Sequence, residues 1–269
     1  MTADDLNNRN SEEMNGKTEL PETLSAEDAA NLPTLEEMAK AGLAYGRKRS
    51  KLNPKMKSYL YGFRANVAVF DLPKTLHMLN VAIDAIKTAV AKGGKVLLVG
   101  TQPAAKAAVV KFASETKHPV VTERWLGGTL TNFKTILRRI EHFKKLKDDR
   151  NTGRLQKYTK KERLDIDKEI ERGDKLFGGI EGMASLPAIV VVIDTVLHDT
   201  AVREARRVKV PVVGFMSSDA DPDFAAYVVP GNCNAIPAIT WVLDRITNAV
   251  KETPVAAPAT AVKPAVKAA

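Results

Sequence analysis

Short runs of β-branched residues alternate along this chain with stretches of helical periodicity, and this alternation limits the fold more than any other feature. Strands are expected at Val67–Phe70, Val96–Val99, Val120–Thr122, Ile189–Ile193, Val212–Phe215 and Tyr227–Val229. Helices are expected over residues 73–91, 103–116, 198–207 and 235–250. Several strand runs are apolar at consecutive positions, which is typical of strands that helices cover on both faces. The order predicts an α/β fold with a doubly wound parallel sheet.

Residues 130–177 interrupt the alternation because they contain no strand signal. Apolar residues recur there at the three- and four-residue steps of an amphipathic helix, at Phe133, Ile136, Leu137, Ile140, Phe143 and Leu146. A polar turn follows at residues 149–153, and Thr159 with Glu162 has the spacing of a capping box that begins a second helix. The pattern predicts an antiparallel helical hairpin inserted in the sheet domain. Residues 134–175 include 15 basic and 9 acidic side chains, so its surface is net positive.

The length of 269 residues fits one α/β domain with an appendage better than several domains. We assign residues 34–129 and 178–250 to that domain, residues 1–33 to a disordered acidic extension and residues 251–269 to a disordered Ala/Pro/Lys tail. No apolar run is long enough to span a bilayer, and the acidic start differs from a secretory signal. With Cys233 as the only cysteine, no internal disulfide can form, and a reducing cytosol is expected.

The charge is distributed unevenly. The net charge is +9, but residues 1–37 hold ten acidic and two basic side chains and carry −8, which leaves +17 on the remaining chain. A body this basic is typical of a protein that binds nucleic acid. The alternative is a basic protein that has no polyanionic partner.

Part of this charge is concentrated in residues 38–70, the basic run, which contains no acidic residue. Its cations are Lys40, Arg47, Lys48, Arg49, Lys51, Lys55, Lys57 and Arg64, and its interleaved aromatic residues are Tyr45, Tyr59, Tyr61 and Phe63. Long cationic side chains beside aromatic rings suit phosphate neutralisation together with base or sugar stacking. We expect the cations to face a ligand and most of the rings to be buried. The alternative is a solvated loop whose rings cover the sheet edge.

The segment Arg124–Asn132 joins an expected strand to the hairpin. Its adjacent glycines, Gly127 and Gly128, allow the backbone to approach another group closely, and Thr129 or Thr131 can cap the helix behind them. This turn suits a phosphate bound at a helix N-terminus. It suits equally a sharp exit of the chain into the hairpin, and both interpretations stay open.

Nothing else in the sequence indicates an active site. The run before Gly100 leads from a strand into a helix, but no G-x-G-x-x-G or P-loop motif occurs, so a nucleotide-dependent enzyme is the weaker alternative. Asp194 and the aspartates of residues 219–223 are expected to form caps and turns rather than a metal site. Cys233 has no identifiable base partner. We therefore expect no catalytic residue, no metal and no cofactor; a free-standing regulator of messenger RNA or DNA is a third alternative.

Ten motifs occur in order along the chain: Asn53–Lys57, Asp71–Thr75, Val99–Thr101, Arg124–Phe133, Leu186-Pro187, Val192–Thr195, Ala201–Ala205, Pro211–Gly214, Asp221–Asp223 and Pro230–Asn232. Together they closely resemble the small-subunit ribosomal protein S-two family, of bacterial type. The resemblance covers about residues 35–250, and the Arg124–Phe133 block is highly specific. The chain departs from the family at Gly42–Arg47, which lacks two histidines that the family usually has, and at Gly231–Asn234.

The resemblance implies a Rossmann-like α/β/α domain with a coiled-coil hairpin, in a non-catalytic protein of the cytoplasmic small ribosomal subunit. It implies binding to small-subunit ribosomal RNA, recruitment of ribosomal protein S-one and contacts with other small-subunit proteins, with no membrane and no small-molecule substrate as partners. We assign the angle of the hairpin to Gly127 and Gly128. We assign RNA contacts to Arg47, Lys48, Arg49, Lys51, Lys55, Lys57, Arg64, Arg124, Lys134, Arg138 and Arg139.

Overall fold

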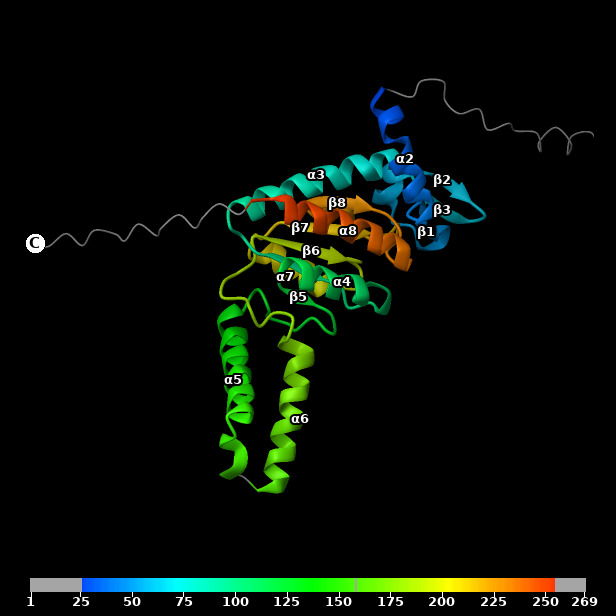
Figure 1. Ribbon diagram of the computed structural model, residues 1–269. Coiled ribbons are helices and arrows are strands. Elements are labelled where there is room, and N and C mark those ends of the chain that lie inside the picture. Colours follow the sequence, from blue (N-terminus) through cyan, green and yellow to red (C-terminus); the bar gives the residue numbers. More distant parts are fainter. Residues whose placement is uncertain (1–25, 158, 255–269) are drawn as a thin grey trace, which may run out of the picture.

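The computed structural model describes residues 26–157 and 159–254, so the expectations for residues 1–25 and 255–269 lie outside the described residues. Its centre is a parallel sheet with the strand order β5-β4-β6-β7-β8 (Figure 1). The strands are β4 (Val96–Val99), β5 (Val120–Val121), β6 (Ile189–Ile193), β7 (Val212–Met216) and β8 (Tyr227–Pro230). The chain passes from β4 to β5 on one side and later adds β6, β7 and β8 on the other. This doubly wound order confirms the predicted fold class.

Helices connect these strands and cover both faces of the sheet. They are α3 (Leu72–Ala91), α4 (Pro103–Thr116), α7 (Asp199–Arg207) and α8 (Ile236–Glu252), each within two residues of its predicted bounds. Val96 and Leu98 face a core shared with α3, α4 and α8, whereas Leu97 and Val99 face a core shared with α7 and the root of the hairpin. Because successive side chains of a strand point to opposite faces and both are buried, these strands are apolar throughout.

A second, antiparallel sheet was missed by the sequence analysis. It contains β1 (Tyr45–Lys48), β2 (Leu60–Arg64) and β3 (Val67–Phe70) in the order β1-β3-β2. The expectation that Val67–Phe70 belongs with the parallel strands is wrong. Its residues alternate between half-buried and buried, the pattern of a sheet with one solvated face. A two-residue turn with positive φ at Ala65 and Asn66 joins β2 to β3, and the asparagine was the local signal for it.

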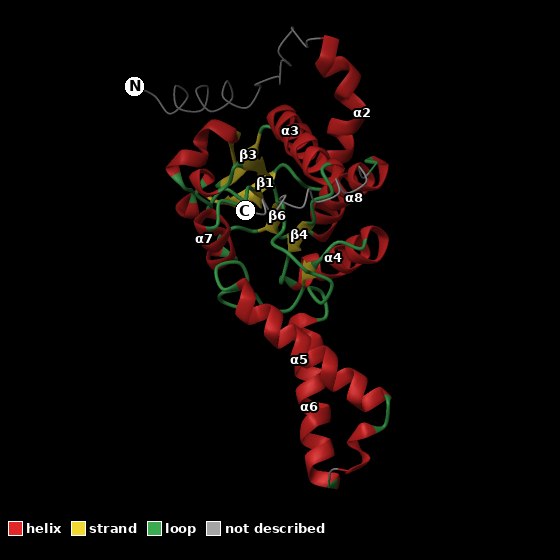
Figure 2. Cartoon of the chain, turned by 90° about the vertical axis from the view of Figure 1, so that its left-hand side faces the viewer, coloured by secondary structure: helices red, strands yellow, loops and turns green. Residues whose placement is uncertain are grey.

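The predicted hairpin is present. It consists of α5 (Phe133–Asn151) and α6 (Lys160–Phe177), connected through a 3-10 helix (Arg154–Lys157), and it projects from the sheet domain (Figures 1 and 2). The expected capping box begins α6, because Thr159 and Glu162 each accept a hydrogen bond from the backbone N–H of the other. Phe143 of α5 packs onto Gly173 of α6, where a Cβ would overlap the ring. Supercoiling of the two helices stays a prediction.

Helix α2 (Ala26–Lys40) begins within the residues assigned to the N-terminal extension and continues into a segment with a buried apolar anchor at Met38. The boundary of the extension at residue 33 stays a prediction. Two further contacts attach α2 to α8: Trp241 Nε1 donates to Glu37 Oε2 at 3.4 Å, and Arg245 donates to Thr34 Oγ1 at 3.4 Å. At the other end, α8 extends through Glu252 into the segment assigned to the tail.

Candidate nucleic-acid interface

The carboxyl edge of the parallel sheet between β4 and β6 is the usual ligand site in a doubly wound fold. Here the chain's own side chains occupy it. Gln102 Nε2 donates to Asp194 Oδ2 at 2.6 Å, and the Thr101 N–H donates to His198 Nε2 at 3.2 Å. Val109 and Ile193 pack so closely against Gly100 that a Cβ there would have to displace them. This packing gives no support to the nucleotide-dependent alternative.

Arg47, the first of the expected RNA contacts, lies in the same polar network. Its guanidinium is 3.6 Å from Asp194 Oδ2 and 3.4 Å from Asp219 Oδ2, and its backbone N–H donates to Ser218 Oγ at 2.9 Å. The side-chain oxygen of Asn234 accepts from the same guanidinium when its amide is turned toward Arg47. Arg47 therefore cross-links β1 to the edge of the parallel sheet, and its contact with RNA stays a prediction.

The aspartates at the strand ends act as caps and ion-pair partners. Asp194 Oδ1 accepts from the backbone N–H groups of Val196 and Leu197, and Asp221 Oδ1 accepts from the N–H of Asp223, which confirms the expected caps and turns. Lys55 Nζ lies 2.5 Å from Asp223 Oδ2 and 2.9 Å from Asp221 Oδ2, and these hydrogen bonds raise the pKa of Lys55. In the described ranges, no three His, Cys, Asp or Glu side chains are arranged to hold a metal ion.

The other nominated cations of the basic run have exposed side chains and, among the described residues, no carboxylate within ion-pair distance; they are Lys48, Arg49, Lys51, Lys57 and Arg64. The expectation that most of the interleaved rings are buried is wrong, because Tyr45, Tyr61 and Phe63 are 51%, 81% and 42% exposed. They lie on the edge strands of a small sheet whose outer face meets solvent. The Arg49 guanidinium lies 5.2 Å from the centre of the Phe63 ring. Cation and ring together offer a surface for an RNA base.

Glu204 of α7, which the sequence analysis did not nominate, holds the turn that leads into the hairpin. Its carboxylate accepts from the N–H groups of Gly128, Leu130 and Thr131 at 2.8, 3.1 and 3.3 Å, and from Trp125 Nε1 at 3.1 Å. Burial alone would raise the pKa of this carboxyl, but the hydrogen bonds outweigh burial and lower the pKa below its ordinary value. The available signal was that Ala201 and Val208, three residues before and four residues after Glu204, are apolar, since a carboxylate on an apolar helix face needs internal donors.

These contacts favour the hairpin-exit interpretation of the turn over a bound phosphate. The backbone amides that a phosphate would need already donate to Glu204. Gly128 has φ +90°, which strains any residue with a side chain, whereas a Cβ on Gly127 would meet nothing within 4 Å. The expected threonine caps are wrong: Asn132 is the N-cap of α5, and the Thr129 hydroxyl donates to Leu126 O. The role of the two glycines in setting the hairpin angle stays a prediction.

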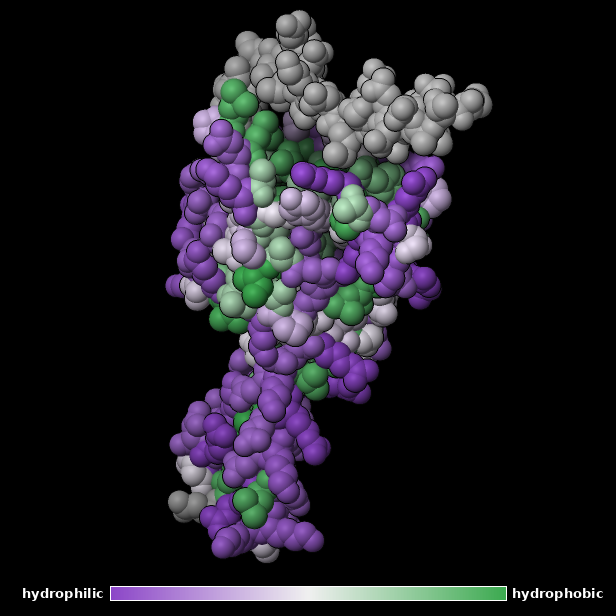
Figure 3. Space-filling model, turned by 90° about the vertical axis from the view of Figure 1, so that its right-hand side faces the viewer, coloured by the Kyte–Doolittle hydropathy of each residue, from purple (hydrophilic) through white to green (hydrophobic). Residues whose placement is uncertain are grey.

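The nominated cations of the hairpin and its entry are all exposed: Arg124, Lys134, Arg138 and Arg139. None of them has a carboxylate within ion-pair distance in the part of the chain that the structure describes. The hairpin surface is predominantly hydrophilic (Figure 3). In Figure 1 the hairpin projects away from the end of the molecule that carries β1, β2 and β3. The nominated cations thus form two separate positive regions.

Similarity to known proteins shows the family of the chain. A family model described as ribosomal protein S2 matches residues 38–253. The chain belongs to the ribosomal protein S2 family. Among curated S2 relatives, small ribosomal subunit protein uS2 of Rhodopseudomonas palustris strain HaA2 and of strain BisB5 are each 42% identical over 217 residues, covering 81% of this chain. The same protein of Bradyrhizobium sp. strain ORS 278 is 40% identical over 216 residues, covering 80% of this chain.

The chain spans 66% of the length of these three relatives. The S2 family is a family of structural proteins rather than of enzymes. None of the described helices is long and apolar enough to cross a membrane. The buried Cys233 is no candidate nucleophile, because burial raises the pKa of its thiol well above the ordinary value.

Proposed function

We propose that this protein is a structural component of the cytoplasmic small ribosomal subunit and that it binds small-subunit ribosomal RNA. The observation that carries the proposal is the match of residues 38–253 to the ribosomal protein S2 family. The relatives with about 40% identity are named as small ribosomal subunit proteins, which supports the same role. Folded ribosomal RNA is a dense polyanion, and the net charge of +17 beyond residue 37 suits it.

The exposed cations supply the chemistry of binding in this proposal. One set surrounds the small antiparallel sheet, and the other lines the hairpin and its entry: Lys48, Arg49, Lys51, Lys57 and Arg64, then Arg124, Lys134, Arg138 and Arg139. These side chains neutralise phosphates, and the exposed rings of Tyr61 and Phe63 stack on bases or sugars. Since phosphate contacts carry little sequence information, the fold of the RNA and the distance between the two regions provide the specificity.

Internal contacts keep these two regions rigid. Arg47 and Lys55 connect the small sheet to carboxylates at the edge of the parallel sheet. Glu204, together with the turn at Gly127 and Gly128, fixes the direction in which the hairpin leaves the domain. Residues held in this way do not need to be reorganised when RNA binds, which lowers the entropic cost of association.

Contacts with ribosomal proteins, including recruitment of ribosomal protein S-one, belong to the same proposal. The α/β domain is the region available for them, because its outer helices are not covered by the hairpin (Figure 1). Val81 of α3, Val110 of α4 and Ile236 of α8 are exposed apolar side chains on these helices. Such side chains suit a protein neighbour better than an RNA backbone.

Sedimentation of a cell lysate tests the proposal. We expect the tagged chain to sediment with small subunits, and a variant with Lys48→Glu, Lys51→Glu and Lys57→Glu to be depleted from them while its thermal unfolding is unchanged. A wild-type chain that stays outside the ribosomal fractions would overturn the proposal and favour the free-standing regulator. Equilibrium dialysis with labelled nucleotides should show no stoichiometric binding, whereas a saturable site would favour the enzyme alternative.

A further inference from the structure

One face of the small antiparallel sheet brings together side chains that lie apart in the sequence. Directly opposed residues of antiparallel strands point to the same face of a sheet. The strand pairing thus places six residues on one face, in two rows across β1, β3 and β2: Tyr45, Val69 and Gly62, then Lys48, Val67 and Arg64. We call this the outer face, because the other residues of β3, Ala68 and Phe70, are buried.

Two register shifts produce this arrangement. One residue is added in β1 between Tyr45 and Lys48, and another in β2 between Leu60 and Gly62. Without the first addition, Tyr45 and Lys48 would point to opposite faces, since successive side chains of a strand alternate. Bulges of this kind commonly redirect a side chain toward a functional surface. The backbone of β1 therefore presents a ring and a cation on the same side.

The row that contains Tyr45 forms a low, mainly apolar platform. The Tyr45 side chain is 51% exposed, and Val69 beside it is half-buried. At the other end of the row, a Cβ on Gly62 would meet nothing within 4 Å, so the surface there is open. A glycine inside a strand often marks a place where a ligand approaches closely. The platform thus offers one accessible ring and free space beside it.

Cations border the platform in the neighbouring row. Lys48 and Arg64 lie on the two edge strands with Val67 between them, so their backbones are two strand spacings, or about 10 Å, apart. Both are exposed and, in residues 26–157 and 159–254, have no carboxylate within ion-pair distance. The end of the molecule that carries this sheet faces the viewer in Figure 3, where apolar side chains lie among hydrophilic ones above the hairpin.

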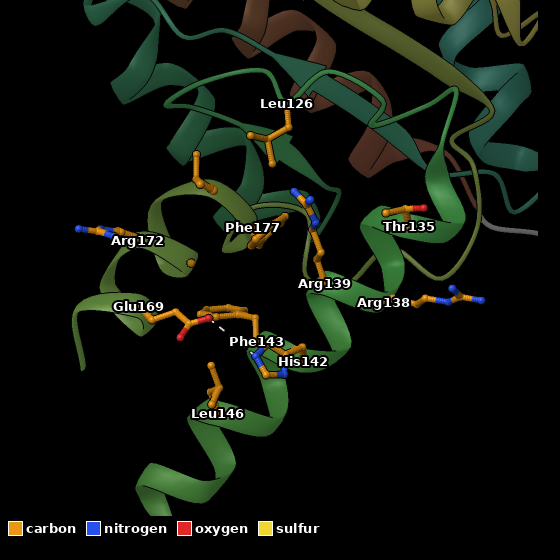
Figure 4. A pocket seen from close by; sticks show the side chains of 12 residues that line it. Leu126, Thr135, Arg138, Arg139, His142, Phe143, Leu146, Glu169, Arg172 and Phe177 are labelled. Atoms are coloured by element: carbon orange, nitrogen blue, oxygen red, sulfur yellow. Dashed lines mark ion pairs between the residues drawn. The ribbon is translucent and has the colours of Figure 1, made fainter. Parts of the chain in front are cut away.

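The rings of the hairpin are less accessible than Tyr45. Phe143 is 4% exposed and packs onto Gly173. Figure 4 shows the Phe143 ring between α5 and α6, while Arg138 and Arg172 point outward on opposite sides. This arrangement suits contacts with phosphates rather than with bases. The two positive regions therefore differ in what they can recognise.

We propose that the outer face of the β1-β3-β2 sheet binds one unpaired base of single-stranded RNA, which stacks on the Tyr45 ring. The flanking phosphates lie at Lys48 and Arg64. The inference rests on the proposed function and names the RNA feature that the small sheet recognises. Proteins read RNA mainly at unpaired bases, whose faces are free to stack on aromatic side chains. A neighbouring protein is the competing occupant, and the two cations without acidic partners favour RNA.

The test compares two single-stranded RNAs of about twelve nucleotides, within the site size of known single-strand binders. One carries adenine throughout, and the other carries abasic sites throughout and has the same phosphates. We expect the full-length protein to bind the adenine strand about tenfold more tightly than the abasic strand at equal salt concentration, as one stacked base would give. Fluorescence anisotropy of end-labelled strands measures both dissociation constants.

Matched variants locate this preference on the outer face. Tyr45→Leu removes the ring and should abolish the preference, whereas Tyr45→Phe keeps the ring and should retain it. Gly62→Val fills the open space with a residue that favours strands and should also abolish the preference. Gly182→Val adds the same side chain at an exposed turn, where a Cβ also meets nothing within 4 Å, and should retain it. Arg138→Gln in the hairpin should weaken the binding of both strands equally.

The outcomes separate the two proposals, once circular dichroism melting has verified that each variant is folded. Equal binding of both strands by the wild type, or an unchanged preference in Tyr45→Leu or in Gly62→Val, would overturn the base site and leave the proposed function in place. A preference lost in Tyr61→Leu but not in Tyr45→Leu would also overturn it, because the stacking ring would lie outside this face. Failure of the protein to bind either strand or its own ribosomal RNA would count against both proposals.

A further outcome identifies the competing occupant. If Tyr45→Leu leaves the binding of both strands unchanged but depletes the chain from small subunits, a neighbouring protein covers the outer face and the inference is wrong.

Discussion

The small antiparallel sheet and the helical hairpin are both rich in basic residues, yet the two regions use their charge differently. In the hairpin, Lys134, Arg138 and Arg139 are exposed and, among the described residues, have no ion-pair partner. In the basic run, Arg47 and Lys55 pair with carboxylates of the parallel-sheet edge, more than 140 residues further along the chain. An acid-free stretch of sequence is therefore not the same as an uncompensated surface, because distant segments supply the counter-charges.

The largest effect is expected where the hairpin is attached. Glu204→Ala leaves the amides of Gly128, Leu130 and Thr131 without an acceptor and should lower the free energy of unfolding by about 3 kcal/mol. Urea denaturation measures the change, and Glu171→Ala, which removes an exposed acid from α6, is the control. Equal stability of both variants would show that the turn does not depend on Glu204.

The same carboxylate predicts a pH dependence. Because the pKa of Glu204 is lower in the folded than in the unfolded state, its contribution is complete above the ordinary glutamate pKa and is lost as the pH falls through the folded value. Glu204→Gln should therefore make stability fall less steeply between about pH 5 and pH 3 than in the wild type. Thermal melting across this range measures both slopes, and parallel curves would contradict the assignment.

The next effect separates the internal from the external cations of the basic run. Arg47→Gln leaves Asp194, which is 4% exposed, without its cationic partner and should cost about 2 kcal/mol of folding stability. Lys48→Gln removes an exposed cation one residue later and should change stability by less than about 0.5 kcal/mol. Chemical denaturation of the pair measures the difference. Similar losses of stability in the two variants would show that the ion pairs of Arg47 contribute no more to folding than the exposed Lys48 does.

A smaller effect is expected within the hairpin. Gly173→Ala places a methyl group against the Phe143 ring and should cost about 1.5 kcal/mol by forcing α5 and α6 apart. Gly182→Ala is the matched control, because a Cβ there meets nothing within 4 Å. Thermal unfolding compares the two. If Gly173→Ala is more stable than the wild type, the two helices accommodate the methyl group without losing stability.

The smallest effect on stability should accompany a clear effect on RNA binding. Replacing Lys134 and Arg138 by Gln, or Lys48 and Lys51 by Gln, should change stability by less than about 0.5 kcal/mol per site. Each pair should reduce the salt dependence of binding to small-subunit ribosomal RNA, by a log–log slope of about 0.7 to 0.9 per lost phosphate contact. Filter binding at several salt concentrations measures the slope. The sequence led us to assign an RNA contact to Lys55, but its ammonium group pairs with Asp221 and Asp223, so we expect Lys55→Gln to leave the slope unchanged. A slope altered only by Lys55→Gln would mean that the paired lysine, and not the exposed cations, contacts RNA.

The sequence predicted the parallel sheet and its helices well because strong local patterns encode them. Runs such as Ile189–Ile193 are apolar on both faces, and helix ends carry local signals such as the capping box at Thr159. The β1-β3-β2 sheet was missed because its strands are short and half-solvated, so their alternation is weak. The site was harder to predict, because Arg47 and Glu204 bind partners that only the folded chain brings within reach.

Lysine acetylation, read by mass spectrometry on the free protein and on purified small subunits that contain it, tests whether the exposed cations contact RNA. We expect lysines of both positive regions to become protected on assembly, namely Lys48, Lys51, Lys57 and Lys134. We also expect Lys55 to react slowly in both states, because its ammonium group is paired with Asp221 and Asp223. Equal reactivity of the four exposed lysines before and after assembly would contradict the claim that these surfaces contact RNA.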